Sequence, residues 1–264
     1  MNQRMTMLIL SCDKFSDLWD GHVKLLEQNW PDRDMDTIIV TDKARQVTYD
    51  SVSVFAAGDE LEWSERLLKV IEAIKTDYVF LTLDDYYLVK RVNTQSIDKM
   101  LNLMEVKNLD YIRLFKRPTK ATRAEFSDFK GVYQIDPGSK YSVNLYSGIW
   151  KKEFLKSCIG EPMNAWQFEV HLPAEAVKYG ANCAVSLNKD FEILDVVRKG
   201  KLLHQASYYF KKNPGIYNGN RPTNTWGYEI RLGIKTLVGR HTPKPIHNAI
   251  RNIMKRFGYQ FYSE

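Results

Sequence analysis

Two adjacent carboxylates follow an apolar segment of the sequence. Asp84 and Asp85 come directly after residues 78–83 (YVFLTL), whose apolar side chains predict a buried strand. Adjacent carboxylates at the end of a strand are suitable ligands for a hard divalent cation that also bridges phosphate groups. Mn²⁺ or Mg²⁺ bound there would neutralise negative charge that builds on a departing phosphate group. The alternative is an acidic turn exposed to solvent.

The segments around this pair alternate between strand-like and helix-like patterns. We predict strands at residues 5–10, 37–40, 51–55 and 78–83, and helices at residues 16–29 and 63–74. Such alternation is typical of a parallel sheet covered by helices. Ligands of these sheets bind beyond the carboxyl ends of the strands. The polar residues that close the predicted strands are therefore candidates for a binding site: Ser11, Asp13, Asp42, Asp84 and Asp85.

The rest of the chain continues the α/β pattern. We predict further strands at residues 111–115, 132–135, 142–146 and 191–197, helices at 96–107, 151–158 and 169–179, and a charged loop at 117–130. A length of 264 residues suits one α/β domain with a small C-terminal annex. We therefore predict a mostly parallel, Rossmann-like central sheet flanked by helices in residues 1–204. A basic extension, residues 205–264, would follow and end in an amphipathic helix.

Positive charge is concentrated near the C-terminus. The formal net charge is +6, and residues 198–264 contain 13 Lys or Arg but only two acidic residues. This distribution indicates an anionic partner, for which nucleotide phosphates, a lipid surface and nucleic acid are the candidate classes. Residues 245–257 (PIHNAIRNIMKRF) have an apolar face and a basic face, a pattern that suits the surface of an anionic membrane. The alternative is a terminal helix docked on its own domain.

Cysteine usage and hydropathy narrow the class of protein. Cys12, Cys158 and Cys183 are odd in number and widely spaced, which argues against a disulfide framework or a zinc site and suits a reducing cytoplasm. The apolar run at the N-terminus is too short for the core of a signal peptide. No run of about 18 apolar residues predicts a membrane-spanning helix. We therefore expect a cytoplasmic protein, with peripheral attachment to the inner face of the cell membrane as the alternative.

Four stretches of the chain resemble a group of bacterial glycosyltransferases of the GT-A fold, which belong to capsule, O-antigen and exopolysaccharide gene clusters. They are residues 63–67 (WSERL), 78–86 (YVFLTLDDY), 147–155 (SGIWKKEFL) and 166–169 (WQFE). The resemblance extends from about Met7 to His204. GT-A enzymes carry an Asp-x-Asp-like metal motif where this chain has Asp84-Asp85-Tyr86. The missing third-position carboxylate leaves open which aspartate touches the metal directly.

The resemblance implies a nucleotide pocket at the first two strand ends. Ser11 and Asp13 would lie near the nucleoside, and Asp42 would contact the ribose or the uracil. The alternative for Asp42 is a solvated turn residue that only ends a strand. Arg66 lies on the helix before the metal strand, and it would either reach the pocket or pair with Glu62 on the helix surface.

A basic loop follows the last predicted strand. Arg198, Lys199 and Lys201 flank Gly200, and a flexible loop of this kind can close over a diphosphate and stabilise the leaving group electrostatically. His204 comes shortly after the loop, and the resemblance implies that it completes the metal shell, as a C-terminal histidine does in several GT-A enzymes. The alternatives are a solvated turn and a structural or exposed histidine.

Glu169 is the candidate catalytic base. In inverting GT-A enzymes, an acidic residue at roughly this separation from the metal motif removes the proton of the acceptor hydroxyl, which requires an ionised carboxylate. Trp150 and Trp166 are the candidate acceptor-binding side chains. The alternatives are that Glu169 begins a helix, where its charge suits the helix dipole, or that Glu153 or Glu161 is the base.

Together, the residues and the resemblance predict a metal-dependent transferase. We expect it to move a sugar with inversion from a nucleotide sugar, a UDP-hexose with galactofuranose among the candidates, to a lipid-linked or oligosaccharide acceptor. A sugar nucleotidyltransferase is the second hypothesis, although residues 8–17 lack the glycine-rich phosphate loop that this chemistry normally uses. A non-catalytic module that binds membranes or nucleic acid is the third. Because nucleic-acid recognition motifs are absent, we expect no nucleic-acid partner. The sequence leaves the oligomeric state open.

Overall fold

The computed structural model of the chain describes residues 4–115 and 122–241, with only the backbone of residues 235–241. These residues form two compact units. In the described part of the chain, the first comprises residues 4–115, 122–195 and Asn213–Gly219, and the second comprises Val196–Lys212 and residues 220–241. The first break therefore falls before the boundary expected at residue 204, because residues 196–212 group with the C-terminal part of the chain. The amphipathic helix expected at residues 245–257 and the first part of the loop expected at 117–130 lie outside the described residues.

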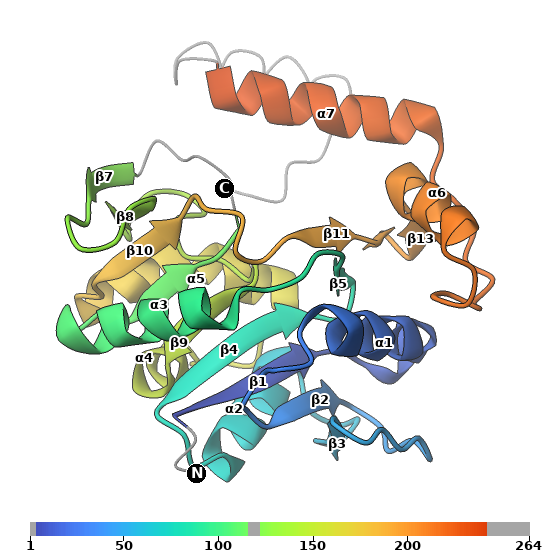
Figure 1. Ribbon diagram of the computed structural model, residues 1–264, viewed down its shortest axis with the longest axis horizontal. Coiled ribbons are helices and arrows are strands. Elements are labelled where there is room, and N and C mark those ends of the chain that lie inside the picture. The colour runs from blue at the N-terminus through green and yellow to red at the C-terminus, as the bar shows by residue number, and fades with distance from the viewer. Residues whose placement is uncertain (1–3, 116–121, 242–264) are drawn as a thin grey trace. The chain divides into compact units, whose positions relative to one another are not determined.

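The first unit is built on a sheet with the strand order β3-β2-β1-β4-β9-β6-β10-β8-β7 among the described residues (Figure 1). Four parallel strands form one half: β1 (Met5–Leu10), β2 (Thr37–Thr41), β3 (Ser53–Ala56) and β4 (Tyr78–Leu83). Met7 pairs with Thr37 on one side of β1 and with Phe80 on the other. Every residue of β1 is buried, as expected for a parallel strand covered on both faces. The strand order reverses between β1 and β4, since β2 and β3 extend the sheet in the opposite direction from β4.

The other half of the sheet is mixed. It contains β6 (Tyr111–Arg113), β7 (Thr122–Glu125), β8 (Val132–Ile135), β9 (Gly148–Lys151) and β10 (Cys183–Ser186). Strand β9 lies antiparallel between β4 and β6, and β8 lies antiparallel beside β10 and β7. The other strands share one direction, which confirms the expected α/β fold with a mostly parallel central sheet flanked by helices.

Helices cover both faces of the sheet. α1 (Trp19–Asn29) and α3 (Thr94–Val106) lie on one face, and α2 (Trp63–Ala73), α4 (Lys152–Ser157) and α5 (Ala165–Tyr179) lie on the other (Figure 1). A short 3-10 helix, η1 (Asp13–Leu18), leads from β1 into α1. Alternate residues of β1 serve the two faces: Met7 and Ile9 pack with the α1 and α3 side, whereas Leu8 and Leu10 pack with the α2 side.

The starts of three helices follow local capping signals. The Asn93 side chain accepts a hydrogen bond from Ser96 N at the start of α3, and Glu62 and Asn164 form capping boxes at the starts of α2 and α5. The Asn164 capping box fixes the beginning of α5 at Ala165. Glu169 therefore lies one turn inside the helix and does not begin it, which differs from the helix start expected from the sequence.

The segment before β9 also differs from expectation. Residues 142–146 were expected to form a strand, but the structure has turns and bends there. The Ser142 hydroxyl lies 2.6 Å from the Pro137 carbonyl oxygen, and Asn144 Nδ2 donates to the Tyr141 carbonyl at 2.8 Å. Such local side-chain hydrogen bonds compete with strand pairing. They hold residues 139–147 as a loop, which we call the β8–β9 loop.

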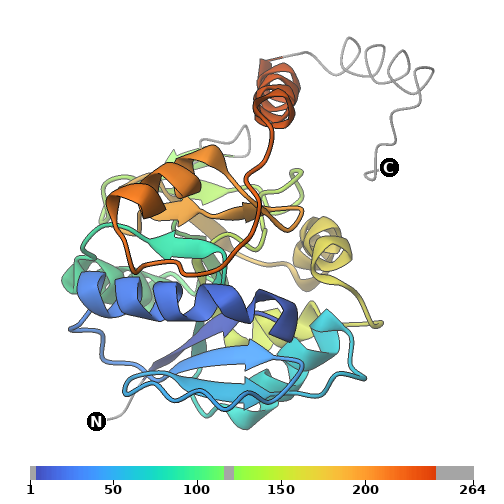
Figure 2. The same cartoon turned by 90° about the vertical axis from the view of Figure 1, so that its right-hand side faces the viewer.

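Two short segments complete the first unit. β5 (Tyr86–Leu88) pairs antiparallel with β11 (Ile193–Asp195). The segment Asn213–Gly219, which we call the strap, returns to this unit from the second one. The strap runs along η1 and α1 (Figure 2): Tyr217 Oη donates to Asp17 of η1 at 3.0 Å, and Lys24 Nζ of α1 donates to the Gly215 carbonyl at 3.4 Å. A Cβ atom at Gly21 would overlap the Ile216 carbonyl oxygen, so glycine permits this close approach.

The second unit consists of a hairpin and two helices in its described part. The hairpin strands are β12 (Val197–Arg198) and β13 (Lys201–Leu202), and the helices are α6 (His204–Lys212) and α7 (Trp226–His241). The backbone of Leu202 donates to the Pro222 carbonyl at 3.0 Å and accepts from Asn224 N at 2.8 Å. In the part of the chain that the structure describes, no helix is long and apolar enough to span a membrane.

Candidate functional site

The carboxyl ends of β1 and β4 meet where the strand order reverses. Ser11 follows β1, Asp84 follows β4, and Asp84 N donates to the Leu10 carbonyl at 3.2 Å. Ser11 Oγ donates a short hydrogen bond to Asp84 Oδ2, and both residues are buried. In open α/β sheets, ligands bind in the crevice at such a reversal. The structure therefore brings two of the expected residues together at the edge where ligands of this architecture bind.

Two side chains of α1 support this pair. Trp19 Nε1 donates to Ser11 Oγ at 2.7 Å, and His22 Nδ1 lies 3.1 Å from the carbonyl oxygen of Asp84. Burial lowers the pKa of His22 to about 4, so its imidazole is neutral at pH 7. Ser11 was expected beside a nucleoside, but its buried hydroxyl is engaged by Trp19 and Asp84. Its place in the structure is that of a support for Asp84.

Asp42 closes β2 and holds the loop that follows β1. Its Oδ1 accepts hydrogen bonds from Asp13 N at 2.5 Å, Lys43 N at 3.0 Å and Thr41 Oγ1 at 3.1 Å. Burial raises the pKa of Asp42, but these hydrogen bonds outweigh burial and leave the pKa below its ordinary value. Asp42 is therefore ionised at neutral pH and more than a solvated turn residue. Asp13 in turn accepts a hydrogen bond from Arg45 Nε at 2.5 Å.

The charges of the two strand-end aspartates, Asp84 and Asp42, both act on the thiol of Cys12. Burial raises its pKa, and the negative charges of Asp84 and Asp42 raise it further. The positive charge of Arg66 acts in the opposite direction. The geometry agrees: Ser11 donates to Asp84, and Asp13 N donates to Asp42. Because Ser11 and Asp13 are two residues apart, the carboxylates that follow β2 and β4 both contact the short segment after β1.

Helix α2 brings positive charge toward this edge. Arg66 Nη1 donates to the Leu61 carbonyl at 2.7 Å, and Lys69 Nζ donates to the Ala57 carbonyl at 2.5 Å. Arg66 therefore binds the Leu61 carbonyl and does not form the ion pair with Glu62 that was one of its two expected roles. Its guanidinium is anchored to the backbone just before α2, close enough to influence the Cys12 thiol.

The β8–β9 loop brings Glu169 to the same edge of the sheet. Leu145 N donates to Glu169 Oε1 at 3.3 Å, which ties the loop to α5. The hydroxyls of Ser147 and Thr82 are 2.8 Å apart, which ties the same loop to β4. Since Thr82 lies two residues before Asp84, the loop joins the candidate base to the strand that carries the acidic pair.

A group of aromatic rings lies beside this connection. The rings of Tyr86 and Tyr146 are nearly parallel with centroids 5.7 Å apart, and Tyr146 stacks on Phe115 at 4.5 Å. Tyr86 follows Asp85 directly in sequence, and Tyr146 follows Leu145. The rings therefore join the acidic pair to the β8–β9 loop on a second path. Flat aromatic surfaces next to carboxylates suit a ligand with a ring, such as a sugar or a base.

The two tryptophans expected at an acceptor differ in their surroundings. Trp150 lies in β9, is 0% exposed and packs on Tyr111 and Phe154, with ring centroids 4.3 Å and 5.7 Å away. This position in the core excludes direct contact with an acceptor and corrects that expectation. Trp166 lies in the first turn of α5 and is 45% exposed, so it stays a candidate.

The basic residues 198–201 form a tight hairpin turn in the second unit. Arg198 pairs with Lys201, and both residues between them have positive φ, 52° at Lys199 and 75° at Gly200. Positive φ at both central residues is typical of a two-residue hairpin turn. Asn224 Nδ2 lies 3.2 Å from the Arg198 carbonyl and 3.3 Å from the Lys201 carbonyl, which fastens the hairpin. The flexible loop expected there is a braced turn, and its contact with a diphosphate stays a prediction.

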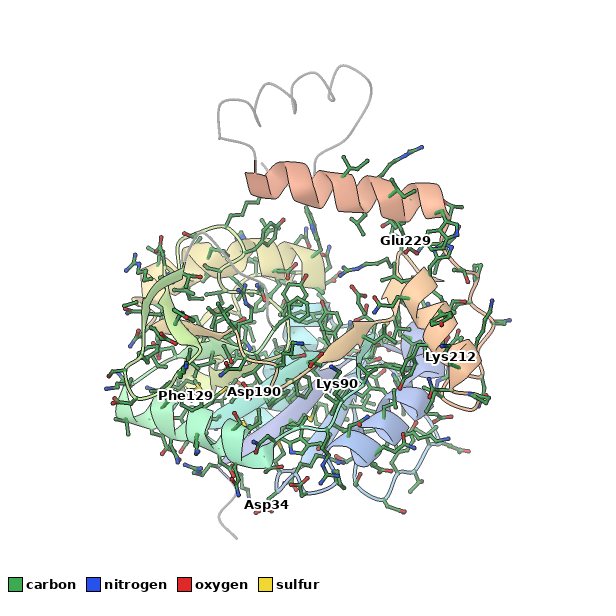
Figure 3. The ribbon with its side chains drawn as sticks, turned by 45° about the horizontal axis from the view of Figure 1, so that its top comes forward. Asp34, Lys90, Phe129, Asp190, Lys212 and Glu229 are labelled. Atoms are coloured by element: carbon green, nitrogen blue, oxygen red, sulfur yellow. The ribbon has the colours of Figure 1, made fainter. Side chains whose placement is uncertain are left out.

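His204 is also held within the second unit. Its Nδ1 lies 2.8 Å from Glu229 Oε1, its backbone N donates to the same oxygen at 2.9 Å, and its ring stacks on Trp226 with centroids 3.7 Å apart. Figure 3 labels Glu229 near the start of α7. These contacts are those of a structural histidine at the start of α6. Its expected part in a metal shell stays a prediction.

The donors at the end of β4 suit a hard divalent cation. Asp84 and Asp85 supply carboxylate oxygens, and Mg²⁺ commonly binds one or two carboxylates together with substrate phosphates and water. In residues 4–115 and 122–241, no group of three or more His, Cys, Asp or Glu is arranged as a metal site. Two carboxylates alone would leave the other coordination positions of such a cation to a phosphorylated ligand and water.

Several residues of this site have no signal in the strand pattern. Trp19 and His22 lie three residues apart on the buried face of α1, and that helical spacing is the one sequence feature that could have identified them. Arg45 comes from the irregular segment between β2 and β3. Tyr146 comes from the β8–β9 loop, so its place beside Tyr86 depends on the tertiary fold.

Comparison with known proteins gives weak likenesses of fold. No protein-family model matches the sequence, and no curated protein sequence matches it. Among solved structures, S. aureus TarS aligns with a TM-score of 0.47 at 12% identity over 72% of this chain and 36% of its own. The bifunctional IspDF from Campylobacter jejuni aligns with a TM-score of 0.43 at 14% identity over 73% and 52%.

A UDP-glucose pyrophosphorylase from Acinetobacter baumanii has a TM-score of 0.47 at 6% identity, with 73% of this chain and 88% of that one covered. The chain spans about a third of the length of TarS and about half of that of IspDF. None of these likenesses by itself assigns an activity to the chain.

Proposed function

We propose that this protein is a metal-dependent glycosyltransferase that moves a sugar from a nucleotide sugar, with a UDP-hexose as the donor, to a hydroxyl of a lipid-linked or oligosaccharide acceptor. One observation supports the proposal: Asp84, Asp42 and Glu169 come from three different elements, and each accepts a hydrogen bond from a segment at the carboxyl ends of the parallel strands. Carboxylates for a cation and a separate carboxylate for a proton are the two requirements of this reaction.

The donor would bind across the ends of β1 and β2. The ionised Asp42 carboxylate can accept hydrogen bonds from ribose hydroxyls or a base N–H, because the hydrogen bonds described for it all involve Oδ1. Asp13 and Arg45 line the same loop as an ion pair. Arg66 supplies positive charge on the α2 side, where phosphates would meet the acidic pair.

Asp84 and Asp85 would hold the Mn²⁺ or Mg²⁺ ion, which when bound neutralises the charge on the leaving diphosphate. Glu169 takes the proton from the acceptor hydroxyl. The freed oxygen forms a bond to the anomeric carbon as the bond from that carbon to the diphosphate oxygen breaks, and the nucleoside diphosphate leaves with the electron pair. One displacement of this kind inverts the anomeric configuration. The half-buried Tyr146, which stacks on the buried Tyr86, provides aromatic surface near the reacting sugars.

The proposal is tested by calorimetric titration with UDP and with GDP, each with and without Mn²⁺. We expect UDP binding that depends on Mn²⁺ and falls at least about tenfold in Asp85→Ala, since one carboxylate of a one- or two-carboxylate site is lost. Asp77→Ala is a matched control, because Asp77 is an exposed aspartate at the other end of β4, about 20 Å away along the strand. Asp77→Ala should bind like the wild type.

Other outcomes identify the competing functions. Release of pyrophosphate when a nucleoside triphosphate and a sugar phosphate are added would identify a nucleotidyltransferase and contradict the proposal. Absence of binding by either nucleotide under every condition, together with salt-sensitive binding to anionic vesicles or nucleic acid, would identify a binding module. Retention of the anomeric configuration in the product, measured by NMR, would contradict the single displacement with Glu169 as base.

A further inference from the structure

Asp84 is held by hydrogen bonds at its carboxylate, its backbone amide and its backbone carbonyl. Its Oδ2 accepts from Ser11 Oγ, its backbone N donates to Leu10, and its backbone carbonyl accepts from His22 Nδ1. The side chain is 7% exposed. Both the main chain and the carboxylate are therefore fixed from the β1 and α1 side before any ligand arrives.

The Ser11 hydroxyl has its direction set by Trp19. Trp19 Nε1 is a donor only, so its 2.7 Å contact uses a lone pair of Ser11 Oγ. The hydroxyl hydrogen is then available for Asp84 Oδ2, which is much closer than the other acceptor in reach, the Cys12 carbonyl at 3.3 Å. The hydrogen bonds therefore run in one sense from the indole through the serine to the carboxylate. A hydrogen bond to one carboxylate oxygen fixes the plane of the whole group.

His22 fixes the backbone of the same residue. The carbonyl of Asp84 accepts only, so the 3.1 Å contact requires the hydrogen of the imidazole to be on Nδ1. The imidazole meets the Tyr87 ring edge-on, with centroids 5.7 Å apart. Trp19 and His22 lie three residues apart and therefore on one face of α1, so a single rigid helix supports Asp84 at two atoms.

We propose that Trp19, Ser11 and His22 are positioning residues that hold the Asp84 carboxylate ready for the metal–nucleotide ligand. This inference rests on the proposed function, because it assigns the three buried side chains to that same site. Residues that orient metal-binding groups commonly change metal affinity by about 10- to 100-fold when they are replaced. None of the three needs to touch the ligand.

Calorimetric titration of Mn²⁺ with UDP tests the proposal. We expect Ser11→Ala to weaken binding about tenfold or more, and Trp19→Phe, which keeps an aromatic ring but removes the N–H, to weaken it by a smaller factor. Because Trp19 acts through Ser11, the double variant should bind within about twofold of Ser11→Ala. Independent losses that multiply in the double variant would contradict the relay.

A second pair of variants tests His22. An asparagine amide at this position carries an N–H close to the position of Nδ1, so His22→Asn should retain most of the affinity that His22→Ala loses. Equal affinities in the two variants would remove His22 from the proposal. Thermal unfolding of each variant confirms that the protein is folded at the temperature of the titration.

Thr6→Val is the matched control for Ser11→Ala. Thr6 lies at the other end of the same strand, is buried, and its hydroxyl is 2.9 Å from that of Thr76. Loss of this hydroxyl should lower stability to a similar extent but leave Mn²⁺–UDP affinity unchanged. If the wild type binds Mn²⁺–UDP and Ser11→Ala binds equally well, the positioning role is wrong and the proposed function stands. If the wild type does not bind, both are wrong.

Discussion

The acidic residues at the strand ends and the basic residues of the β12–β13 hairpin are held in different ways. Asp84 is buried and is fixed by a hydroxyl, an imidazole and the backbone of a neighbouring strand. Lys201 is exposed, and Lys199 has a positive φ in a two-residue turn. The hairpin is braced through its carbonyl groups by Asn224, and Lys199 Nζ lies over the Tyr228 ring, 5.8 Å from its centroid.

This difference separates two kinds of contribution to binding. Side chains fixed in advance lose little conformational entropy when a ligand arrives, so they can set its geometry. Exposed basic side chains lose rotamer freedom on binding and contribute mainly long-range attraction that salt screens. We therefore expect substitutions at the strand ends to change specific binding and turnover, and substitutions in the hairpin to have small effects that depend on salt.

The largest expected effect is that of Glu169→Gln. Amide replacement removes the proton acceptor but keeps the shape and the contact with Leu145, so kcat should fall by about 10²- to 10⁴-fold while UDP affinity stays the same. Steady-state kinetics and titration measure the two quantities. Glu153→Gln and Glu161→Gln are controls with exposed carboxylates. A large loss of kcat in either control instead of Glu169→Gln would move the base elsewhere.

The next largest effect is a loss of folding stability at acidic pH, caused by protonation of His22. Its pKa is about 4 in the folded chain and about 6.5 when unfolded, so protons bind preferentially to the unfolded chain. The stability that depends on neutral His22 is fully present above pH 6.5 and is lost as the pH falls toward 4. Between pH 7 and pH 5 the loss should be about 2 kcal/mol.

Urea unfolding at the two pH values measures this loss. His22→Asn should flatten the dependence of the unfolding free energy on pH, because the buried imidazole is removed. An identical slope in the wild type and His22→Asn would show that His22 does not titrate as its burial requires.

The smallest effect is expected in the hairpin. Lys199→Gly relieves the positive φ of a side-chain-bearing residue and should raise the unfolding free energy by roughly 0.5–1 kcal/mol. Lys199→Gln removes the same charge but keeps the backbone strain, so it should not stabilise the protein. If both variants bind UDP with the same reduced, salt-sensitive affinity, the charge of Lys199 acts on the nucleotide. Wild-type affinity in both would exclude that role.

The sequence was sufficient to predict the four parallel strands and the acids that follow them. Strands β1 and β4 are apolar except for one threonine each. Asp84 is the first charged residue after β4, and Asp42 is the first after β2. Their convergence follows from parallel pairing, since parallel strands bring their carboxyl ends to one edge. The mixed half of the sheet was harder to predict, because β9 is antiparallel and the residues before it form a loop by local hydrogen bonds.

Roles that depend on burial could not be predicted residue by residue. Trp150 has an aromatic side chain of the kind that binds sugars, but it lies in the core and packs on Tyr111 and Phe154. Ser11 has a polar side chain at a strand end, but Trp19 reaches it from the next helix. Such roles depend on which side chains from different elements come into contact in the fold. The periodicity of strands and helices does not contain that information.

The strap limits where the protein can be truncated. The strap packs on α1, but in sequence it lies between two stretches that belong to the second unit. The polypeptide therefore passes from one unit to the other three times. A stop codon after Asp195 would delete the strap together with the hairpin and α6, and would uncover Asp17 of η1 and the side of α1 that carries Gly21. Truncation at one point therefore cannot remove the second unit without also removing part of the first. Swapping the second unit between related chains would require junctions on both sides of the strap.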